Sequence, residues 1–218
     1  MNEDVWVIIP AHNEEKNIQN VILETKKYCE NIVVVDDGSC DNTKRLAQDS
    51  GATVLTHIIN LGKGSALKTG CDYAYKKGAK KIVLMDSDGQ HQPSEIPHFL
   101  KALENNDIVF GCRNFDQKMP WVFKFGNRFI NWATKILYGI RINDTQSGYR
   151  AFNTGIYRKI RWKATDYSVE SEMIANLGRK NLKYNQIPIQ TIYEDNYKGT
   201  TIFDGIKIVF NMFFWRLK

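Results

Sequence analysis

Apolar positions in the first half of the chain follow two alternating patterns. Short, continuous apolar runs predict β-strands, and stretches with apolar residues three or four positions apart predict α-helices. The predicted strands are residues 5–9, 32–35, 52–56, 81–85 and 107–110. The predicted helices are residues 14–28, a segment capped by Asp41 or Asn42 that runs to residue 48, and residues 64–77 and 93–104. Apolar strands that alternate with helices predict an α/β fold, with a mostly parallel sheet sandwiched by helices.

The second half has a different pattern. Residues 119–138 interleave aromatic and basic side chains, residues 168–179 and 203–215 have helical spacing, and residues 187–192 predict a further strand. Repeats and low-complexity segments are absent from the sequence. We therefore expect a single domain of 218 residues with a functional boundary near residues 111–113.

Composition narrows the class of protein. A chain of this length buries a large core without disulfides, and its four cysteines show neither C-x-x-C pairs nor zinc-ligand spacing. The first residues do not resemble a signal peptide, and there is no run of about 18 apolar residues. These features predict a cytoplasmic protein that is soluble or lies on a membrane. The apolar C-terminal stretch leaves open a spanning segment beyond residue 218.

Positive charge is concentrated in the middle of the chain. Residues 113–163 carry eleven Lys and Arg against two acids, a local charge of +9, so the remaining residues net −3 of the chain's overall +6. A basic segment attracts phosphate on a lipid, a membrane surface or a nucleic acid. A solvated basic face is the simpler alternative.

Polar and acidic residues follow three of the predicted strands. The clusters are P-A-H-N-E at residues 10–14, D-D-G-S at 36–39 and D-S-D-G-Q-H at 86–91. Each alone is consistent with an ordinary turn. Ligands of open α/β sheets bind at the carboxyl ends of the strands, so three such clusters predict one shared site.

The third cluster predicts a metal site. Asp86 and Asp88 flank Ser87, and two carboxylates this close repel each other unless a cation lies between them. Oxygen ligands favour Mg²⁺ or Mn²⁺, which bind a few carboxylates together with substrate phosphates. Gln90 offers another oxygen, and His91 is placed to support the metal or its loop.

A glycine turn at residues 60–65 (N-L-G-K-G-S) leads into a predicted helix. Its backbone N–H groups and Lys63 are suited to a diphosphate, although an ordinary loop with a solvated lysine has the same sequence features. The phosphate-loop pattern G-x-x-x-x-G-K-[ST] and the dinucleotide pattern G-x-G-x-x-G are both absent.

The order and spacing of V-I-I-P-A-H-N-E-E, V-V-V-D-D-G-S, N-L-G-K-G-S-A and L-M-D-S-D-G-Q-H resemble the family 2 glycosyltransferases. The later D-T-Q-S-G-Y-R-A-F (144–152) resembles the subgroup with dolichyl-phosphate mannosyl- and glucosyltransferases. The resemblance implies a type-A glycosyltransferase fold with a Rossmann-like half. It divides the chain into a nucleotide-sugar-binding half (1–112), an acceptor-binding half (113–202) and an amphipathic interface helix (203–218).

The resemblance also implies roles for individual residues. The residues that it implies for nucleotide binding are Pro10, Asn13, Glu14, Asp36, Asp37, Lys63 and Asp86. It assigns to Mg²⁺ or Mn²⁺ the oxygens of Asp86, Asp88 and Gln90. It assigns to catalysis Asp88, with Arg113 and Arg128 on the acceptor phosphate and Ser147 near the reacting centre.

The expected reaction moves a hexose from a GDP-mannose or UDP-glucose type of donor to a polyprenyl or dolichyl phosphate, with inversion. A lipid phosphate is already an anion and needs cations rather than a general base, and arginine binds phosphate through two parallel hydrogen bonds. If the acceptor is a hydroxyl, Glu170 or Glu172 is the candidate base, although both could instead orient loops or arginines.

Two segments suggest peripheral contact with the cytoplasmic face of a membrane. Residues 120–138 combine aromatic and basic residues, and residues 203–215 have a broad apolar surface. Packing on the protein's own core is the alternative, and a homodimer is left open.

The chain departs from the family pattern at His12, where an aromatic residue is usual, and at Arg158, which replaces the Gln of the processive Q-x-x-R-W motif. Three alternative functions stay open: a glycosyltransferase that acts on a sugar or protein hydroxyl, a D-x-D phosphohydrolase, and a nucleic-acid-binding protein. We expect no nucleic-acid partner, because that reading leaves the carboxylate clusters without a role.

Overall fold

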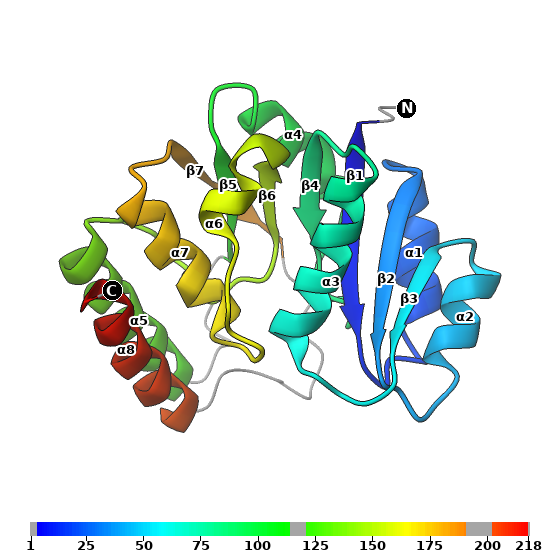
Figure 1. The fold of residues 1–218 in the computed structure, drawn as a ribbon, viewed down its shortest axis with the longest axis horizontal. Helices are drawn as coiled ribbons and strands as arrows, with labels where there is room; N and C mark the ends of the chain where they lie inside the picture. Colours follow the sequence, from blue (N-terminus) through cyan, green and yellow to red (C-terminus); the bar gives the residue numbers. More distant parts are fainter. Residues whose placement is uncertain (1–3, 114–120, 191–201, 218) are drawn as a thin grey trace.

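The computed structural model describes residues 4–113, 121–190 and 202–217, with backbone alone for 121–127, 202–208 and 217. Its centre is a seven-stranded sheet in the order β3-β2-β1-β4-β6-β5-β7 (Figure 1). The strands are β1 (Val5–Ala11), β2 (Asn31–Asp37), β3 (Thr53–His57), β4 (Lys81–Leu84), β5 (Ile108–Arg113), β6 (Arg150–Asn153) and β7 (Tyr184–Ile189). All neighbouring pairs are parallel except those of β6, which is antiparallel to β4 and β5. The predicted α/β class with a mostly parallel sheet is confirmed.

Helices cover both faces of the sheet. The described helices are α1 (Ile18–Lys26), α2 (Thr43–Asp49), α3 (Lys63–Lys76), α4 (Ile96–Ala102), α5 (Trp121–Tyr138), α6 (Tyr157–Ile160), α7 (Val169–Arg179) and α8 (Ile202–Leu217). Helices α3, α6 and α7 bury their apolar sides on one face, and α1, α2 and α4 bury theirs on the other. Strands buried on both faces explain why the apolar runs are continuous rather than alternating.

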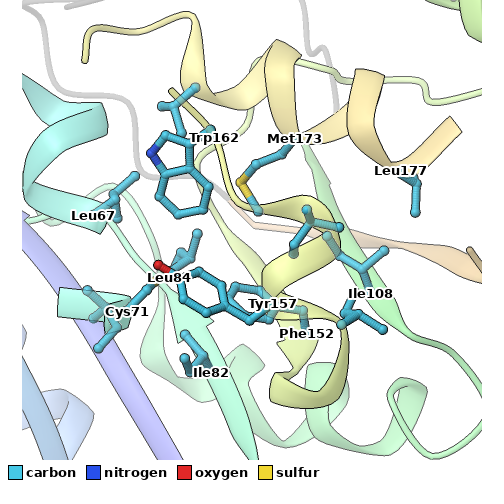
Figure 2. Packing of buried hydrophobic residues seen from close by; sticks show 14 of the residues in the cluster. Leu67, Cys71, Ile82, Leu84, Ile108, Phe152, Tyr157, Trp162, Met173 and Leu177 are labelled. Carbon is cyan, nitrogen blue, oxygen red and sulfur yellow. The ribbon is translucent and has the colours of Figure 1, made fainter. Parts of the chain in front are cut away.

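The face under α3, α6 and α7 holds the larger buried cluster (Figure 2). Trp162 and Met173 pack there above the strand residues Leu84 and Phe152. The indole Nε1 of Trp162 also donates a 2.8 Å hydrogen bond to the carbonyl of Gly64, which ties the second half of the chain to the start of α3. The two halves therefore share one core.

Helix α3 lies unusually close to the sheet because Gly70 lacks a side chain. A methyl group at Gly70 would lie 2.4 Å from Cγ2 of Ile8 and 3.1 Å from Cγ2 of Val35. This contact fixes the helix against β1 and β2, with its first residue, Lys63, toward the edge where these parallel strands end.

Most predicted elements are present, with shifted ends. The strand predicted to stop before Pro10 continues through it to Ala11, and the helix predicted from residue 14 begins at Ile18, after a turn. Residues 93–104 form a short 3₁₀ turn (Pro93–Glu95) followed by α4 rather than one helix. The strand predicted at 187–192 is found at Tyr184–Ile189, and residues 191–192 lie outside the described part.

Strand β6 was not predicted, and it is the element that brings the late motif to the site. Because β6 runs against its neighbours, it begins where β4 and β5 end, with Arg150 opposite Leu84 and Phe110. The loop before β6, residues 144–149, therefore lies at the same sheet edge as the carboxyl ends of the parallel strands.

Helices α5 and α8 pack together at one end of the molecule, away from β3 and α2 (Figure 1). Ile130 and Met212 are buried between them, and the Tyr138 hydroxyl donates a hydrogen bond to the carbonyl of Met212. No helix within the described residues has the length and apolar composition needed to cross a membrane.

Candidate active site

The three predicted clusters meet at one edge of the sheet. Strand pairing places Ala11 opposite Asp36, and β4 lies beside β1 with Leu84 opposite Ile8, so the residues that follow each strand emerge side by side. The end of β5 at Arg113 and the loop 144–149 complete the same edge. The expected convergence of the strand ends is therefore present in the fold.

Lys63 links two carboxylates at the centre of this edge. Its Nζ lies 2.7 Å from Oδ1 of Asp86 and 3.0 Å from Oε1 of Glu170. Burial disfavours the charged forms of both Lys63 and Asp86. The two carboxylates nevertheless raise the pKa of Lys63, while Lys63, His91 and Arg113 outweigh burial and hold the pKa of Asp86 at about 2. The lysine and the aspartate are both charged at neutral pH.

Asp88 is a carboxylate in a different electrostatic state. Burial, followed by the negative charge of Asp86, raises the pKa of Asp88 to about 6. Its Oδ1 accepts a 3.0 Å hydrogen bond from the backbone N–H of Gln90, which closes the turn. A cation bound between Asp86 and Asp88 would relieve the repulsion between their negative charges.

His91 supports the loop that carries these aspartates. Its Nδ1 accepts a 3.1 Å hydrogen bond from the backbone N–H of Asp86, and its ring stacks on Tyr149 with centroids 4.8 Å apart. Burial lowers the pKa of His91 to about 4, so the ring is neutral at pH 7. Tyr149 in turn donates to the carbonyl of Gln92, and this ring pair braces the turn from both ends.

The donor set at this edge fits Mg²⁺ or Mn²⁺. Across the described residues, no three His, Cys, Asp or Glu side chains form a ready-made metal site. Asp86 and Asp88 provide two hard oxygen ligands, and Mg²⁺ in nucleotide sites usually takes one or two carboxylates, substrate phosphates and water. A metal shared with a diphosphate matches this pair better than a metal held by protein alone.

The loop before β6 is held by arginines. Arg113 forms a two-point ion pair with Asp144, with Nε 2.7 Å from Oδ2 and Nη2 3.0 Å from Oδ1. The guanidinium of Arg150 is buried and donates to the backbone carbonyls of Thr145, Ser147 and Glu170. Arg150 thereby joins the loop to the first turn of α7, which carries Glu170.

Gly148 brings this loop into contact with the charged cluster. A methyl group there would lie 2.6 Å from Oδ2 of Asp86 and 2.9 Å from Nζ of Lys63. Close by, Ser147 Oγ and Glu170 Oε2 are the buried side-chain polar atoms that lack a hydrogen-bond partner among the described residues. Unpaired buried polar atoms mark strain, a catalytic role, or a place for a water or an ion.

The turn before α3 is organised by Asp37. Its carboxylate accepts hydrogen bonds from the backbone N–H groups of Leu61 (2.9 Å) and Gly62 (2.7 Å) and lies 2.6 Å from Nδ1 of His57. The N–H of Gly64 donates to the carbonyl of Thr165. The backbone N–H groups of Leu61, Gly62 and Gly64 thus have protein partners, and the Lys63 side chain is the group that reaches the carboxylates.

The remaining predicted nucleotide residues line the ends of β1 and β2. Pro10 is buried within β1, and Asp36 is buried with its Oδ1 accepting from the N–H of Ser39. Asn13 has a left-handed backbone (φ 54°), and its side chain accepts a 2.9 Å hydrogen bond from the N–H of Cys40. Glu14 donates its N–H to the Thr43 hydroxyl. These bonds connect the two loops, and contact with a base stays a prediction.

Two predicted residues are not part of the ion-paired cluster of Lys63, Asp86 and Glu170. Arg128 is exposed on α5, and no ion pair connects it to the carboxylates in the described residues. Glu172 accepts hydrogen bonds from the backbone N–H groups of Lys163 and Ala164, so its carboxylate holds a loop. Residues 119 and 120 of the aromatic–basic segment, and the side chains up to 127, lie outside the described part.

The sequence did not single out Asp144, Gly148 or Arg150 as site residues. They belong to the D-T-Q-S-G-Y-R-A-F motif, which was the available signal. The partners of Asp144 and Arg150 include residues of β5 and α7, and Gly148 lies against Asp86 and Lys63. Only the antiparallel pairing of β6 brings these partners together.

Comparisons with known proteins agree with this arrangement. The model of the family described as glycosyl transferase family 2 matches residues 6–174. The chain is 33% identical to a UDP-N-acetylglucosamine–dolichyl-phosphate N-acetylglucosaminyltransferase of Methanococcus voltae over 95% of this chain and 94% of the relative. It is 28% identical to an undecaprenyl-phosphate mannosyltransferase of Micrococcus luteus, covering 98% and 94%.

A solved structure shows the same fold. Glucosyl-3-phosphoglycerate synthase from Mycobacterium tuberculosis, crystallised with Mn²⁺, uridine diphosphate and phosphoglyceric acid, superposes with a TM-score of 0.78. The match covers 97% of this chain and 78% of that chain at 20% sequence identity. The fold is therefore the predicted type-A glycosyltransferase fold.

Proposed function

The chain belongs to glycosyl transferase family 2, and we propose that it moves a hexose or N-acetylhexosamine from a nucleotide-diphosphate sugar to a polyprenyl or dolichyl phosphate. The relatives named for transfer to dolichyl and undecaprenyl phosphate match over nearly their whole length, which supports this acceptor class. We assign residues 1–112 to the donor and 113–202 to the acceptor.

The observation that favours a phosphate acceptor is the state of the two candidate bases. Oε1 of Glu170 is held by Lys63, and the carboxylate of Glu172 is held by two backbone N–H groups. A hydroxyl acceptor needs a nearby carboxylate to take its proton. A phosphate monoester is already anionic and needs no such base. It therefore suits a site in which Glu170 is paired with Lys63 and Glu172 accepts from backbone N–H groups.

The donor would bind with its diphosphate against Lys63, Asp86 and Asp88. Asp86 and Asp88, with Gln90, would hold Mg²⁺ or Mn²⁺, which neutralises the charge that develops on the leaving diphosphate. Lys63 provides a further cation for the same oxygens. Attack from the opposite face of the sugar gives inversion of the anomeric centre.

The acceptor phosphate would bind on the basic side of the site. Arg113 follows β5 at the sheet edge, and its ion pair with Asp144 fixes the direction of the guanidinium. Arg128 would supply a second cation from α5, and Ser147 lies on the loop between Arg113 and the donor carboxylates. Two arginines suit a phosphate because each offers paired N–H donors.

The lipid part of the acceptor suggests a role for α5 and α8 at the cytoplasmic face of a membrane. Their mutual interface uses Ile130 and Met212, yet Trp132 is 58% exposed and Phe213 is 54% exposed. A helix with a second apolar face beyond its protein contacts is typical of an interfacial helix. We propose peripheral contact through this face, with α8 as the interface helix.

Calorimetric titration tests the donor half of the proposal. UDP- and GDP-sugars, including UDP-N-acetylglucosamine, are titrated into the wild type and Asp88→Ala, with Mn²⁺ or with EDTA. We expect one nucleotide class to bind with Mn²⁺ and to lose this binding in EDTA and in the variant. Absence of binding by every donor in the presence of Mn²⁺ would contradict the proposal.

A further inference from the structure

The ammonium of Lys63 forms an ion pair with Asp86, one of the two carboxylates of the predicted metal site. It lies 2.7 Å from Oδ1, and the other oxygen, Oδ2, is closely approached by Gly148 and lies 3.9 Å from Nε2 of His91. The Lys63 side chain is 17% exposed. Asp86, whose side chain is 25% exposed, therefore already has a cation on one of its two oxygens.

A divalent ion and this ammonium compete for the same oxygen. Mg²⁺ binds carboxylate oxygen at about 2.1 Å, which would place it within a few ångströms of Nζ. Two cations this close repel strongly at a largely buried site, where screening by water is weak. The ammonium is held by two carboxylates, 2.7 Å from Oδ1 of Asp86 and 3.0 Å from Oε1 of Glu170. Free metal therefore meets a site that is already partly neutralised.

A nucleoside diphosphate changes this balance. Its oxygens provide Lys63 with a new anionic partner and provide the metal with additional ligands. Lys63 is then free to leave Oδ1 of Asp86 for the diphosphate, while Glu170 keeps the lysine near the site through Oε1. The unpaired Oε2 of Glu170 leaves that carboxylate with acceptor capacity during the exchange.

We propose that Lys63 is the resident counter-ion of Asp86, and that it makes divalent-metal binding depend on the nucleoside diphosphate. The inference rests on the proposed function, and it assigns Lys63 a task besides contact with the donor. The divalent metal alone then binds weakly, and the complex of the metal with the nucleoside diphosphate binds well. The metal and the nucleotide therefore enter the site together.

Titration of Mn²⁺ without nucleotide, followed by electron paramagnetic resonance of free Mn²⁺, tests this assignment. The variants are Lys63→Met and, in case that one is unstable, Lys63→Gln, which keeps a polar side chain without the charge. The matched control is Lys68→Met, which removes the same charge from the same helix, α3. Thermal melts confirm that each protein is folded.

We expect Lys63→Met to bind Mn²⁺ alone at least about tenfold more tightly than the wild type, and Lys68→Met to stay within about twofold. Adding UDP or GDP, whichever binds, should tighten Mn²⁺ binding about 100-fold in the wild type and less than about tenfold in Lys63→Met. The Lys63→Gln variant should change in the same direction by a smaller factor.

Equal Mn²⁺ affinity in the wild type and in folded Lys63 variants would overturn the inference, as would an equal gain in Lys68→Met. These outcomes are distinct from failure of the proposed function. In that case the wild type would show no Mn²⁺-dependent nucleotide binding at all, whatever the behaviour of the variants.

Discussion

The carboxylate edge of the sheet and the α5–α8 face differ in what holds them in place. At the edge, Lys63, Asp86 and Asp37 are fixed by short ion pairs and hydrogen bonds inside the protein. On α5 and α8, Trp132 and Phe213 point outward from helices that already have a packed interface. The first region is preorganised for a small, charged ligand, and the second offers area to a large apolar one.

This difference has a physical origin. Buried charges are stable only when each has a partner, so a polar site must be built by the fold before the ligand arrives. An apolar surface needs no fixed partner, because its affinity follows the area removed from water. Substitutions at the edge should therefore affect the reaction itself, and substitutions on α5–α8 should affect access to a lipid.

The largest effect is expected at the acidic pair. Asp88→Ala should lower transfer by about 10³-fold, because the charge on the leaving diphosphate loses its stabilisation. The melting temperature should hold or rise, since the change also removes a repulsion with Asp86. Steady-state kinetics with the cognate donor measures the loss. The control is Asp49→Ala, an exposed acid at the end of α2. Near wild-type activity in Asp88→Ala would place the metal elsewhere.

A smaller effect is expected where the loop 144–149 touches the cluster. Gly148→Ala should lower kcat by about 10- to 100-fold, because its methyl group would displace Asp86 and Lys63. The matched control, Gly155→Ala, has open space around its new methyl group and should keep full activity. If both variants behave alike, the loop does not set the geometry of the carboxylates.

The sheet and its site edge could be predicted from sequence to different extents. Continuous apolar runs identified β1, β2 and β4 because each is buried on both faces, and the acidic residues after them marked the edge. Strand β6 was not predicted, because it has only four residues and begins with an arginine. The burial of Arg150 depends on backbone carbonyls at residues 145, 147 and 170, which no local pattern reveals.

The same limit applies to the candidate bases. Glu170 and Glu172 are two residues apart in one short motif, yet the first reaches Lys63 and the second reaches the loop at residues 163 and 164. Sequence suggested both as bases or as orienting residues. Tertiary contacts with α3 and with the segment before α7 favour the orienting role, and the role of either residue as a base stays untested by the fold.

The α5–α8 face should respond only when the acceptor is embedded in a bilayer. The double variant Trp132→Ser/Phe213→Ser should lower vesicle binding, and activity on a long-chain acceptor, by about tenfold. It removes two apolar side chains whose transfer from water into the bilayer favours binding. Activity on a short, water-soluble polyprenyl phosphate should be unchanged. Leu23→Ser, an exposed apolar residue on α1, is the control. Equal loss on both acceptors would assign these side chains to folding or to contact with another copy.

The smallest effect is expected at a half-exposed ion pair away from the site. Asp72 accepts hydrogen bonds from Arg161 and Tyr157, which outweigh burial and lower its pKa. Asp72→Asn should reduce the free energy of unfolding by at most about 1 kcal/mol, because solvent screens the pair. A lowered pKa stabilises the fold above the ordinary value of about 3.9, and this contribution disappears as the pH falls through the folded pKa.

Urea unfolding at pH 7 and pH 3 measures that difference, and transfer activity should not change. A loss of several kcal/mol, or a loss of activity, would mean that this side of α3 is coupled to Lys63 at its other end.

Transfer to a phosphorylated lipid tests the central claim most directly. The wild type is incubated with Mn²⁺, its cognate labelled donor and either a polyprenyl phosphate or the same polyprenol without phosphate, and the lipid fraction is counted. We predict label in the lipid only with the phosphate, in an acid-labile sugar–phosphate linkage. Equal labelling of the polyprenol, or labelling of a sugar hydroxyl instead, would contradict the phosphate acceptor.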